Sequence, residues 1–305
     1  RYLLPQKFNQ VKKADDPKFI ESILNICIKN KIDIVLPLVT KELNILSQNI
    51  FKFQRRDIKV IVSDFETIKI ANNKGKLYDH LKKSNLTLPK YFISNNLKDI
   101  NTHILCLGYP KIPVVVKPCI GNGSRGIRIL DSNQDSLSLL LNEKPNSLYM
   151  EKDAFINTLS KADKIPNYLV SEFLPGNELT IDTIIHSGKM HDFLIRTRDQ
   201  MRAGISISGR FIKNEEVKNY VDRIISTLPG LNGPVGFQVK QSFKNKFLLL
   251  ECNPRIQGTS VAAKGLGVNL VSRAINLAIG NSLDKIIKTE GVGFNRYYEE
   301  IFYDY

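Results

Sequence analysis

Hydrophobic and polar residues follow a repeated helix–strand pattern along roughly the first seventy positions. Positions 17–29 place an apolar stripe on one helical face, and the apolar run 32–38 that follows is typical of a short buried strand. A second stripe over 41–53 and a second apolar run over 58–64 repeat the pattern. Alternation of this kind predicts parallel strands joined by crossover helices, and therefore an α/β protein.

The next stretch is predicted to link this region to a second one that is richer in strands. A helical stripe that includes Leu77 and Leu81 continues to Leu88, and Pro89 is expected to end the helix because proline disfavours its continuation. Residues 89–112 are predicted to be a connector with one short helix.

From residue 113 onward, short apolar runs predict strands and hairpins. Two hairpin signals are Ser187-Gly188, between alternating strands, and the polar turn 241–246, between the apolar runs 235–239 and 247–251. The span 142–167 is polar and weakly patterned, and we expect a mobile excursion there. The other predicted elements are strands at 114–118 and 127–130, a strand entering a turn over 168–176, and helices at 134–141, 215–228 and 261–279, the last broken around 265–267.

Oxygen-bearing side chains gather at the end of the 235–251 hairpin. Gln238 lies in its first strand, Glu251 ends the second strand, and Asn253 and Arg255 follow. Because strand side chains alternate between two faces, Glu251 and Asn253 can point the same way. A carboxylate and two amide oxygens suit a hard cation, and a guanidinium beside them suits phosphate. The alternative interpretation is a strand end capped by an Asn-Pro turn.

A glycine-rich loop over 121–126 matches G-x-G-x-x-G, and its context decides between several interpretations. A dinucleotide site needs a helix after the loop, whereas the apolar run 127–130 indicates a strand. The sequence contains neither the catalytic-loop and D-F-G motifs of protein kinases nor a P-loop motif. Two interpretations remain. One is a hairpin that closes over phosphates, with Lys117 in the preceding strand, and the other is a plain glycine turn.

Length and composition exclude several classes of protein. The 305 residues allow two domains or one large domain, and 42% hydrophobic and 24% charged residues are ordinary for a globular protein. No apolar run approaches the roughly 18 residues of a membrane span, and the opening residues lack a signal-peptide pattern. The four cysteines are scattered without a C-x-x-C pair, which predicts a reduced cytoplasmic protein without a structural zinc site.

A formal net charge of +14 would suit nucleic acid, yet the lysines are spread along the whole chain. No basic run is interleaved with aromatic residues, so the pattern argues against a nucleic-acid binder. Part of the excess charge could instead serve a polyanionic nucleotide.

Four motifs together resemble those of the ATP-grasp superfamily, in the branch of the carbamoyl-phosphate synthetase large chain. Asn73-Lys74 stands where that family has Asp-Lys, and residues 114–129 resemble its lysine strand and glycine lid. Residues 168–182 are similar to its adenine hinge, and residues 248–258 resemble its metal-binding Glu-x-Asn-Pro-Arg motif. The resemblance covers almost the whole chain, in the family's order.

The resemblance implies a fold and a division of the chain. Residues 73–280 would form an ATP-grasp domain, in which two α+β subdomains grip ATP. Residues 1–72 would form a partial, Rossmann-like pre-ATP-grasp domain whose first strand is missing from the sequence, and residues 281–305 a C-terminal extension that packs back on the core.

The resemblance also implies which residues bind ATP. Lys74 and Lys117 would contact its phosphates, and Glu178 would accept hydrogen bonds from the ribose hydroxyls. The loop glycines and serine would close over the phosphates, and the hinge residues would face the adenine edge; these are Gly121, Gly123, Ser124, Gly126, Glu172, Phe173 and Leu174.

By the same resemblance, Gln238, Glu251 and Asn253 would hold one or two Mg²⁺ ions, or Mn²⁺ in their place, and Arg255 would neutralise charge on the transferred phosphoryl group. Two positions depart from the family pattern, since Asn73 replaces the usual acid and Gln238 stands where many relatives have a carboxylate. Two fewer charges weaken the attraction for a metal, so a lapsed enzyme stays open as an interpretation.

The implied reaction is the activation of a carboxylate by ATP, through an acylphosphate that an amine then attacks. The segment 196–210 would line the acceptor side, where Arg196, Arg198 and Arg202 offer bidentate recognition of a carboxylate. We therefore predict an ATP- and Mg²⁺-dependent carboxylate–amine ligase with small-molecule substrates and no membrane partner, compatible with a homodimer. The alternative is a non-catalytic nucleotide-binding regulatory or scaffold protein.

Overall fold

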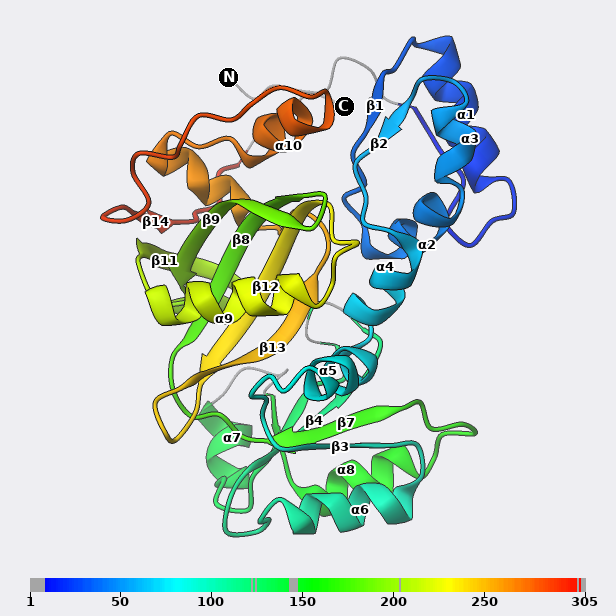
Figure 1. Cartoon of the computed structure of the whole chain (residues 1–305). Helices are drawn as coiled ribbons and strands as arrows, with labels where there is room; N and C mark the ends of the chain where they lie inside the picture. Colours follow the sequence, from blue (N-terminus) through cyan, green and yellow to red (C-terminus); the bar gives the residue numbers. More distant parts are fainter. Residues whose placement is uncertain are drawn as a thin grey trace.

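The computed structural model describes residues 9–121, 123, 125–142, 148–202, 204–300 and 302. Within this part, the chain forms a small N-terminal unit, a five-stranded sheet and a seven-stranded sheet (Figure 1). The N-terminal unit lies beside one end of the seven-stranded sheet, and the five-stranded sheet lies at the other end. Among these residues, no helix is long and apolar enough to span a bilayer.

The N-terminal unit is a two-stranded parallel sheet with helices, as the sequence pattern predicts. Its strands pair Ile34 with Lys59 and Val35 with Val60, and its core includes Phe19, whose side chain is buried. Its elements are α1 (Phe19–Lys29), β1 (Ile34–Val35), α2 (Thr40–Gln48), α3 (Ile50–Gln54), β2 (Lys59–Val60) and α4 (Phe65–Ala71).

The single helix predicted over 41–53 is instead two helices that meet at Asn49. The side-chain amide of Asn49 donates to the carbonyl of Ile45 at 2.9 Å, so it competes with the backbone ladder at the junction. Both strands are also shorter than the apolar runs that predicted them, and Leu38 at the end of the first run is exposed.

Helix α5 (Lys74–Lys83) lies between the two large sheets and packs on strands of both. Asn73 is its N-cap, with its side chain accepting from the Lys76 amide, and Asn caps a helix as well as Asp does. The helix ends at Lys83 and not at Pro89, so the prediction that the proline stops it is wrong. Left-handed Asn85 and the bond from the Leu86 amide to the Leu81 carbonyl form a Schellman motif, which ends the helix by itself.

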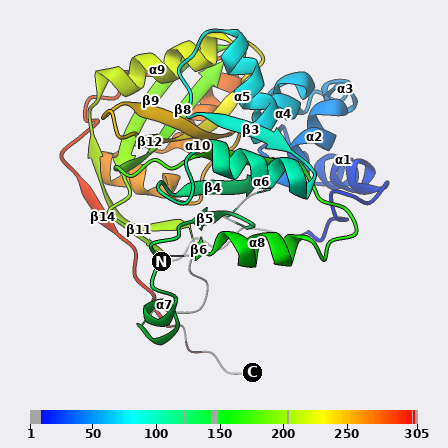
Figure 2. The ribbon, with the colours of Figure 1, turned by 90° about the horizontal axis from the view of Figure 1, so that it is seen from below.

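The five-stranded sheet has the strand order β3-β7-β4-β5-β6. Helices α6 and α8 lie on its face away from the seven-stranded sheet, where Ile100, Ile104 and Phe155 are buried (Figures 1 and 2). Its elements are β3 (Tyr91–Ser94), α6 (Leu97–Cys106), β4 (Val114–Pro118), β5 (Arg128–Leu130), α7 (Ser136–Asn142), β6 (Tyr149–Met150), α8 (Lys152–Leu159) and β7 (Tyr168–Glu172).

Two predictions for this region need correction. The one helix predicted within residues 89–112 is present as α6, but the segment is not a simple connector, because β3 forms an edge strand of the sheet. The supposed excursion over 142–167 contains β6 and α8, although residues 143–147 lie outside the described part. Helix α8 buries only Phe155 and Leu159, and so short an apolar stripe gives little periodicity to detect.

The seven-stranded sheet is covered by helices on both faces. Helix α9 packs on one face, and the 3₁₀ helix η1 and helix α10 pack on the other around Ile184, Leu194 and Phe211 (Figure 1). Its elements are β8 (Glu178–His186), β9 (Lys189–Thr197), β10 (Gln200–Arg202), β11 (Ile205–Ile212), α9 (Glu215–Ser226), β12 (Gly233–Gln241), β13 (Phe247–Asn253), η1 (Ser260–Leu266), α10 (Leu270–Ala278) and β14 (Gly293–Asn295).

Both predicted hairpins are confirmed. Strands β8 and β9 pair through the left-handed residues Ser187 and Gly188, and β12 and β13 pair so that Gln238 lies opposite Glu251. The predicted break near residues 265–267 is also present, at left-handed Gly267. Near the C-terminus, β14 pairs antiparallel with β11.

Candidate active site

A cavity of about 740 Å³ lies between the two large sheets and collects residues from all four sequence motifs. The predicted site residues that line it are Lys74, Lys117, Gly123, Gly126, Glu172, Phe173, Leu174, Glu178, Arg198, Gln238, Glu251, Asn253 and Arg255. Ser124 lies outside the described residues. Gly121, Arg196 and Arg202 are not part of the described lining.

The predicted metal ligands lie together at the end of the β12–β13 hairpin. Gln238 is the cross-strand neighbour of Glu251, and the Asn253 side-chain amide donates to Glu251 Oε1 at 2.9 Å. All three side chains bear oxygen atoms, which fits a hard cation such as Mg²⁺. Glu251 is the single carboxylate of the three, and no cluster of three His, Cys, Asp or Glu residues occurs in the described part of the chain. Coordination would therefore rely on one charge and two amide oxygens.

Two lysines lie on the same side of the cavity as Glu251. Lys74 Nζ donates to the carbonyl of Gly121 at 2.9 Å and lies 3.5 Å from Glu251 Oε2, so Gly121 holds this lysine without lining the cavity. Lys117 Nζ donates to the carbonyl of Leu250 at 3.3 Å and lies over the ring of Tyr78. Burial and the neighbouring Lys74 charge lower the pKa of Lys117 to about 8, against the opposing effect of Glu251. Such a site favours the arrival of an anion.

The glycine loop between β4 and β5 contributes two glycines to the cavity wall. Gly123 and Gly126 have φ angles of 62° and 75°, a conformation that other residues rarely adopt. A Cβ on Gly126 would also lie 2.7 Å from Pro118. These positions explain why the loop needs glycine, whatever it binds.

The predicted ribose residue Glu178 and the predicted acceptor residue Arg198 form an ion pair. Arg198 Nε lies 3.1 Å from Glu178 Oε1, and Nη2 donates to the carbonyl of Gly204 at 2.7 Å. Both side chains line the cavity, as do Gly204 and Ser206. The two predicted roles are therefore coupled, because any hydroxyl that reaches Glu178 also meets Arg198.

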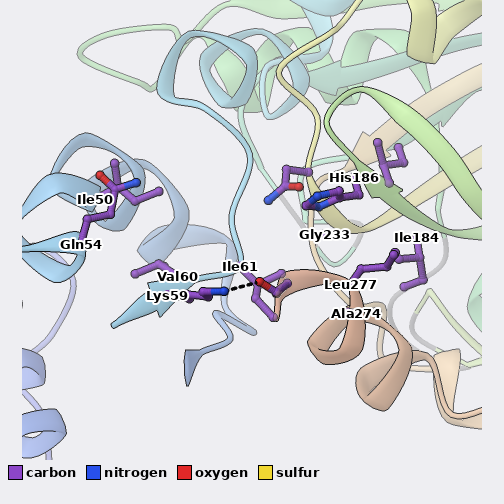
Figure 3. A pocket seen from close by; sticks show the side chains of 13 residues that line it. Ile50, Gln54, Lys59, Val60, Ile61, Ile184, His186, Gly233, Ala274 and Leu277 are labelled. Atoms are coloured by element: carbon purple, nitrogen blue, oxygen red, sulfur yellow. Dashed lines mark hydrogen bonds between the residues drawn. The ribbon is translucent and has the colours of Figure 1, made fainter. Parts of the chain in front are cut away.

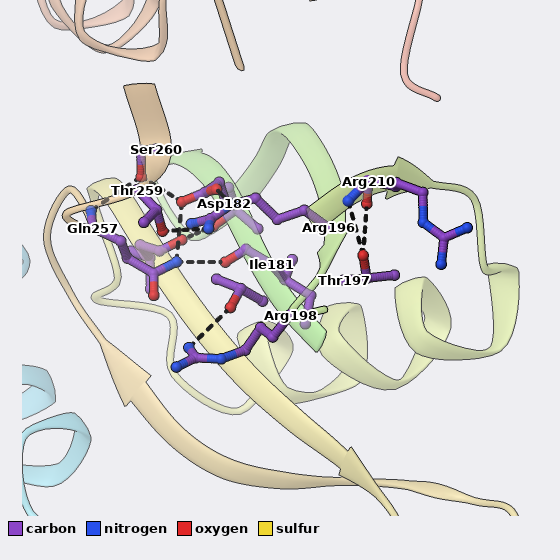
Figure 4. A network of polar contacts seen from close by, with 12 residues as sticks. Ile181, Asp182, Arg196, Thr197, Arg198, Arg210, Gln257, Thr259 and Ser260 are labelled. Carbon is purple, nitrogen blue, oxygen red and sulfur yellow. Dashed lines mark hydrogen bonds and ion pairs between the residues drawn. The ribbon is translucent and has the colours of Figure 1, made fainter. Parts of the chain in front are cut away.

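Arg196 has a structural role that the sequence did not reveal. Its side chain is 0% exposed, pairs with Asp182 at 2.8 Å and donates to Thr259 (Figure 4). Gln257 and Ser260 donate to the same carboxylate, so the network joins β8 and β9 to the segment after β13. The prediction that Arg196 binds an acid is wrong, because a substrate cannot reach a fully buried guanidinium.

Arg202 points toward the C-terminal segment. Its guanidinium lies over the ring of Tyr298 and donates to the Tyr298 hydroxyl at 3.4 Å. The structure brings Arg198 into the cavity and places neither Arg196 nor Arg202 there, so the prediction that Arg202 binds the acid has no support either. Strict strand alternation would place all three arginines on one face, but β9 ends at Thr197 and β10 begins at Gln200, so their spacing alone could not assign their directions.

Sequence reasoning missed several polar residues of the cavity. Arg125 and Arg128 line it beside the glycine loop, and Lys240 lines it near Phe173. Ser206, Gln257 and Thr259 also line it, and in the described structure the buried Ser206 hydroxyl has no hydrogen-bond partner. The two arginines could have been found from their place within the lid motif, whereas Ser206 carries no sequence signal.

Comparison with known proteins agrees with this geometry. Residues 164–297 match a family model described as "ATP-grasp in the biosynthetic pathway with Ter operon", and residues 4–61 match the N-terminal domain of PylC-like proteins. The resemblance to the ATP-grasp superfamily that the sequence motifs indicate is therefore confirmed over residues 164–297. The predicted fold class is thereby confirmed.

Among curated proteins, this chain is similar to carbamoyl phosphate synthase large chains. It is 26% identical to that of Thermoplasma acidophilum over 89% of this chain, and 23% identical to that of Clostridium acetobutylicum over 88%. The aligned part spans 25% and 24% of these proteins, so the chain spans about a quarter of the length of these relatives.

Solved structures share the fold at low sequence identity. Biotin carboxylase from Campylobacter jejuni, solved with an ATP analogue, has a TM-score of 0.67 at 15% identity, covering 92% of this chain and 62% of that one. An L-amino acid ligase from Bacillus licheniformis has a TM-score of 0.63 at 18% identity, covering 88% and 62%. N5-carboxyaminoimidazole synthetase from Staphylococcus aureus, complexed with ADP, has a TM-score of 0.63 at 16% identity, covering 90% and 66%.

Proposed function

We propose that this protein is an ATP- and Mg²⁺-dependent ligase that joins a carboxylic acid to an amine. One observation carries the proposal: a single cavity collects the two lysines, the oxygen cluster around Glu251, and Arg255. This arrangement suits the binding of a triphosphate, because the two lysine ammonium groups and a metal at the candidate site can hold its phosphates. The guanidinium of Arg255 can neutralise charge during phosphoryl transfer.

In the proposed reaction, a carboxylate oxygen attacks the γ-phosphorus of ATP, and ADP leaves. The amine then attacks the acyl carbon of the resulting acylphosphate, inorganic phosphate leaves, and the amine proton is lost to solvent. Mg²⁺, when bound by Gln238, Glu251 and Asn253, would neutralise phosphate charge. Lys74 and Lys117 would hold the phosphates, and Arg255 would stabilise the transferred group.

We place the acid at the end of the cavity where Arg198, Ser206 and Gln257 lie. Arg198 can offer a guanidinium edge to a carboxylate. Ser206 supplies a buried hydroxyl that makes no hydrogen bond to the described residues and could bind the acid. The adenine would lie at the opposite end, along the backbone of Glu172, Phe173 and Leu174.

The test is a screen of carboxylic acids paired with amines for ADP release in the presence of Mg²⁺. We expect turnover with at least one pair and its loss in Glu251→Gln. Once an acid is found, Arg198→Ala should raise its KM about tenfold, the effect of removing a charged hydrogen bond. Arg202→Ala is the matched control and should leave KM unchanged, because Arg202 pairs with Tyr298.

A second candidate is a nucleotide-binding protein without turnover, which the substitution of a carboxylate by Gln238 favours. A broad screen that yields no ADP, although calorimetry shows tight binding of ATP with Mg²⁺, would favour this candidate. Failure to bind ATP at all would contradict both.

A further inference from the structure

The guanidinium of Arg255 is held by a residue from the N-terminal unit, 215 positions away in the chain. Arg255 Nε donates to Thr40 Oγ1 at 2.8 Å, Nη1 donates to the carbonyl of Ile256 at 2.8 Å, and Nη2 lies 3.4 Å from Asn253 Oδ1. A guanidinium has five N–H donors. These contacts use three of them, which leaves one donor on each terminal nitrogen for a ligand in the cavity.

Thr40 is well placed to fix the direction of that guanidinium. It is the first residue of α2, and it is not part of the described lining of the cavity. Its hydroxyl binds the Nε edge, and because the guanidinium is planar, fixing one edge fixes the plane of the two terminal nitrogens.

The N-terminal unit is itself anchored on the seven-stranded sheet by polar contacts. The hydroxyl of Ser63, just after β2, accepts from the Asn232 amide at 3.0 Å and donates to the Asn232 carbonyl at 3.2 Å. The Asp64 amide donates to the carbonyl of Gly230 at 3.0 Å. Lys59 Nζ donates to the carbonyl of Ala278 at 2.9 Å, beside an apolar cleft of about 230 Å³ between the two parts (Figure 3). Thr40 therefore belongs to a unit that these contacts hold against the seven-stranded sheet.

We propose that Thr40 is a positioning residue that orients Arg255 toward the transferred phosphoryl group. The N-terminal unit would thus take part in phosphoryl transfer without touching the nucleotide. This inference rests on the proposed function, because it assumes that Arg255 acts on the γ-phosphate. Without the Thr40 hydroxyl, Arg255 would turn toward the carboxylate of Glu251, whose charge already acts on it.

The test compares the affinities of a non-hydrolysable ATP analogue and of ADP, each with Mg²⁺, by calorimetry on the full chain. Thr40→Val keeps the side-chain shape and removes the hydroxyl, and should weaken binding of the triphosphate about tenfold while ADP affinity changes by less than twofold. Thr40→Ser keeps the hydroxyl and should restore the wild-type ratio. Thr102→Val removes a helix hydroxyl, bonded to the Lys98 carbonyl, in α6 and should change neither affinity.

Arg255→Ala separates failure of this inference from failure of the proposed function. If Arg255→Ala leaves the ratio of triphosphate affinity to diphosphate affinity unchanged, the proposed role of Arg255 is wrong, and the role of Thr40 is wrong with it. If Arg255→Ala lowers the ratio but Thr40→Val does not, only the inference about Thr40 is overturned. Equal weakening of both nucleotides in Thr40→Val, with a lowered Tm, would show a merely structural role and also overturn it. In an Arg255→Ala background, Thr40→Val should have no further effect on the ratio.

Discussion

At the scale of single residues, a few charged and polar side chains determine what the cavity can bind. Lys117 is buried beside Lys74, Glu251 is the single carboxylate of the oxygen cluster, and Gln238 stands opposite it. Each of these residues can be changed without altering the strand that carries it. Their effects should therefore be seen in ligand binding more than in folding.

The pH dependence of nucleotide binding should reflect Lys117. Its pKa of about 8 in the free protein means that its positive charge is lost as the pH rises through 8. A bound phosphate favours the charged form of Lys117, so at high pH the lysine must take up a proton when ADP binds. At pH 9, one unit above the pKa, this requirement should lower ADP affinity about tenfold relative to pH 7. Calorimetric titrations across this range measure the effect.

Lys117→Met provides the control for that experiment, because methionine does not titrate. This variant should bind ADP more weakly at every pH and show a flatter profile between pH 7 and pH 9. A wild-type affinity that stays constant over this range would show that Lys117 does not contact the phosphates.

Gln238→Glu should strengthen the candidate metal site. A second carboxylate opposite Glu251 adds charge to the oxygen cluster, so the Mg²⁺ concentration needed for half-maximal ATP binding should fall severalfold. Without metal, the two like charges repel across the strands, and the Tm should fall by a few degrees. Gln241→Glu on the same strand, whose side chain donates to the Asn245 carbonyl, is the matched control. Unchanged Mg²⁺ dependence in Gln238→Glu would argue against a metal at this position.

At the scale of elements, the hairpins followed local sequence signals closely, whereas the predicted end of α5 did not. Ser187-Gly188 forms the predicted turn, and Asn73 and Asn214 cap helices α5 and α9. The elements missed include the strands β3, β6, β10, β11 and β14, which pair with neighbouring strands, and the short helices α4 and α8, which bury few residues. Their local sequence patterns are too short to predict them, because contacts with neighbouring elements are what stabilise them.

The segment 119–126 should act as a lid, because its glycines leave the backbone little intrinsic stiffness. Amide hydrogen exchange in this segment should slow clearly when an ATP analogue and Mg²⁺ are added. Exchange in α6, on the outer face of the sheet, serves as the internal reference and should not change. Equal exchange of 119–126 with and without nucleotide would contradict the lid.

At the scale of the whole molecule, docking of the N-terminal unit depends on a small set of polar contacts. Ser63 is fully buried, and its hydroxyl satisfies both the amide and the carbonyl of Asn232. Ser63→Ala would leave the partly buried amide and carbonyl of Asn232 without this partner, at up to about 1–3 kcal/mol for each. We expect lower stability toward urea and faster hydrogen exchange in α2.

Ser22→Ala is the matched control for Ser63→Ala, since both hydrogen bonds of the Ser22 hydroxyl stay within the N-terminal unit: it donates to the Phe19 carbonyl at 2.7 Å and accepts from the Lys12 amide at 3.4 Å. It should leave the urea midpoint nearly unchanged. If Ser63→Ala is as stable as the wild type and α2 exchanges at the same rate, the Ser63–Asn232 contacts do not hold the unit in place.

The sequence by itself determined the α/β class, the parallel N-terminal strands and both hairpins, because each depends on periodicity or turn chemistry within a few residues, and its resemblance to a known family supplied the order of the four motifs. It also placed most of the predicted nucleotide and metal residues on segments that the structure brings to one cavity. Only the tertiary structure decided the direction of each arginine: Arg196 into a buried pair with Asp182, Arg198 onto Glu178, and Arg202 onto Tyr298. Only the tertiary structure, too, could join Thr40 to Arg255, since a contact across 215 residues depends on how two separately patterned units dock and leaves no periodic trace in either of them.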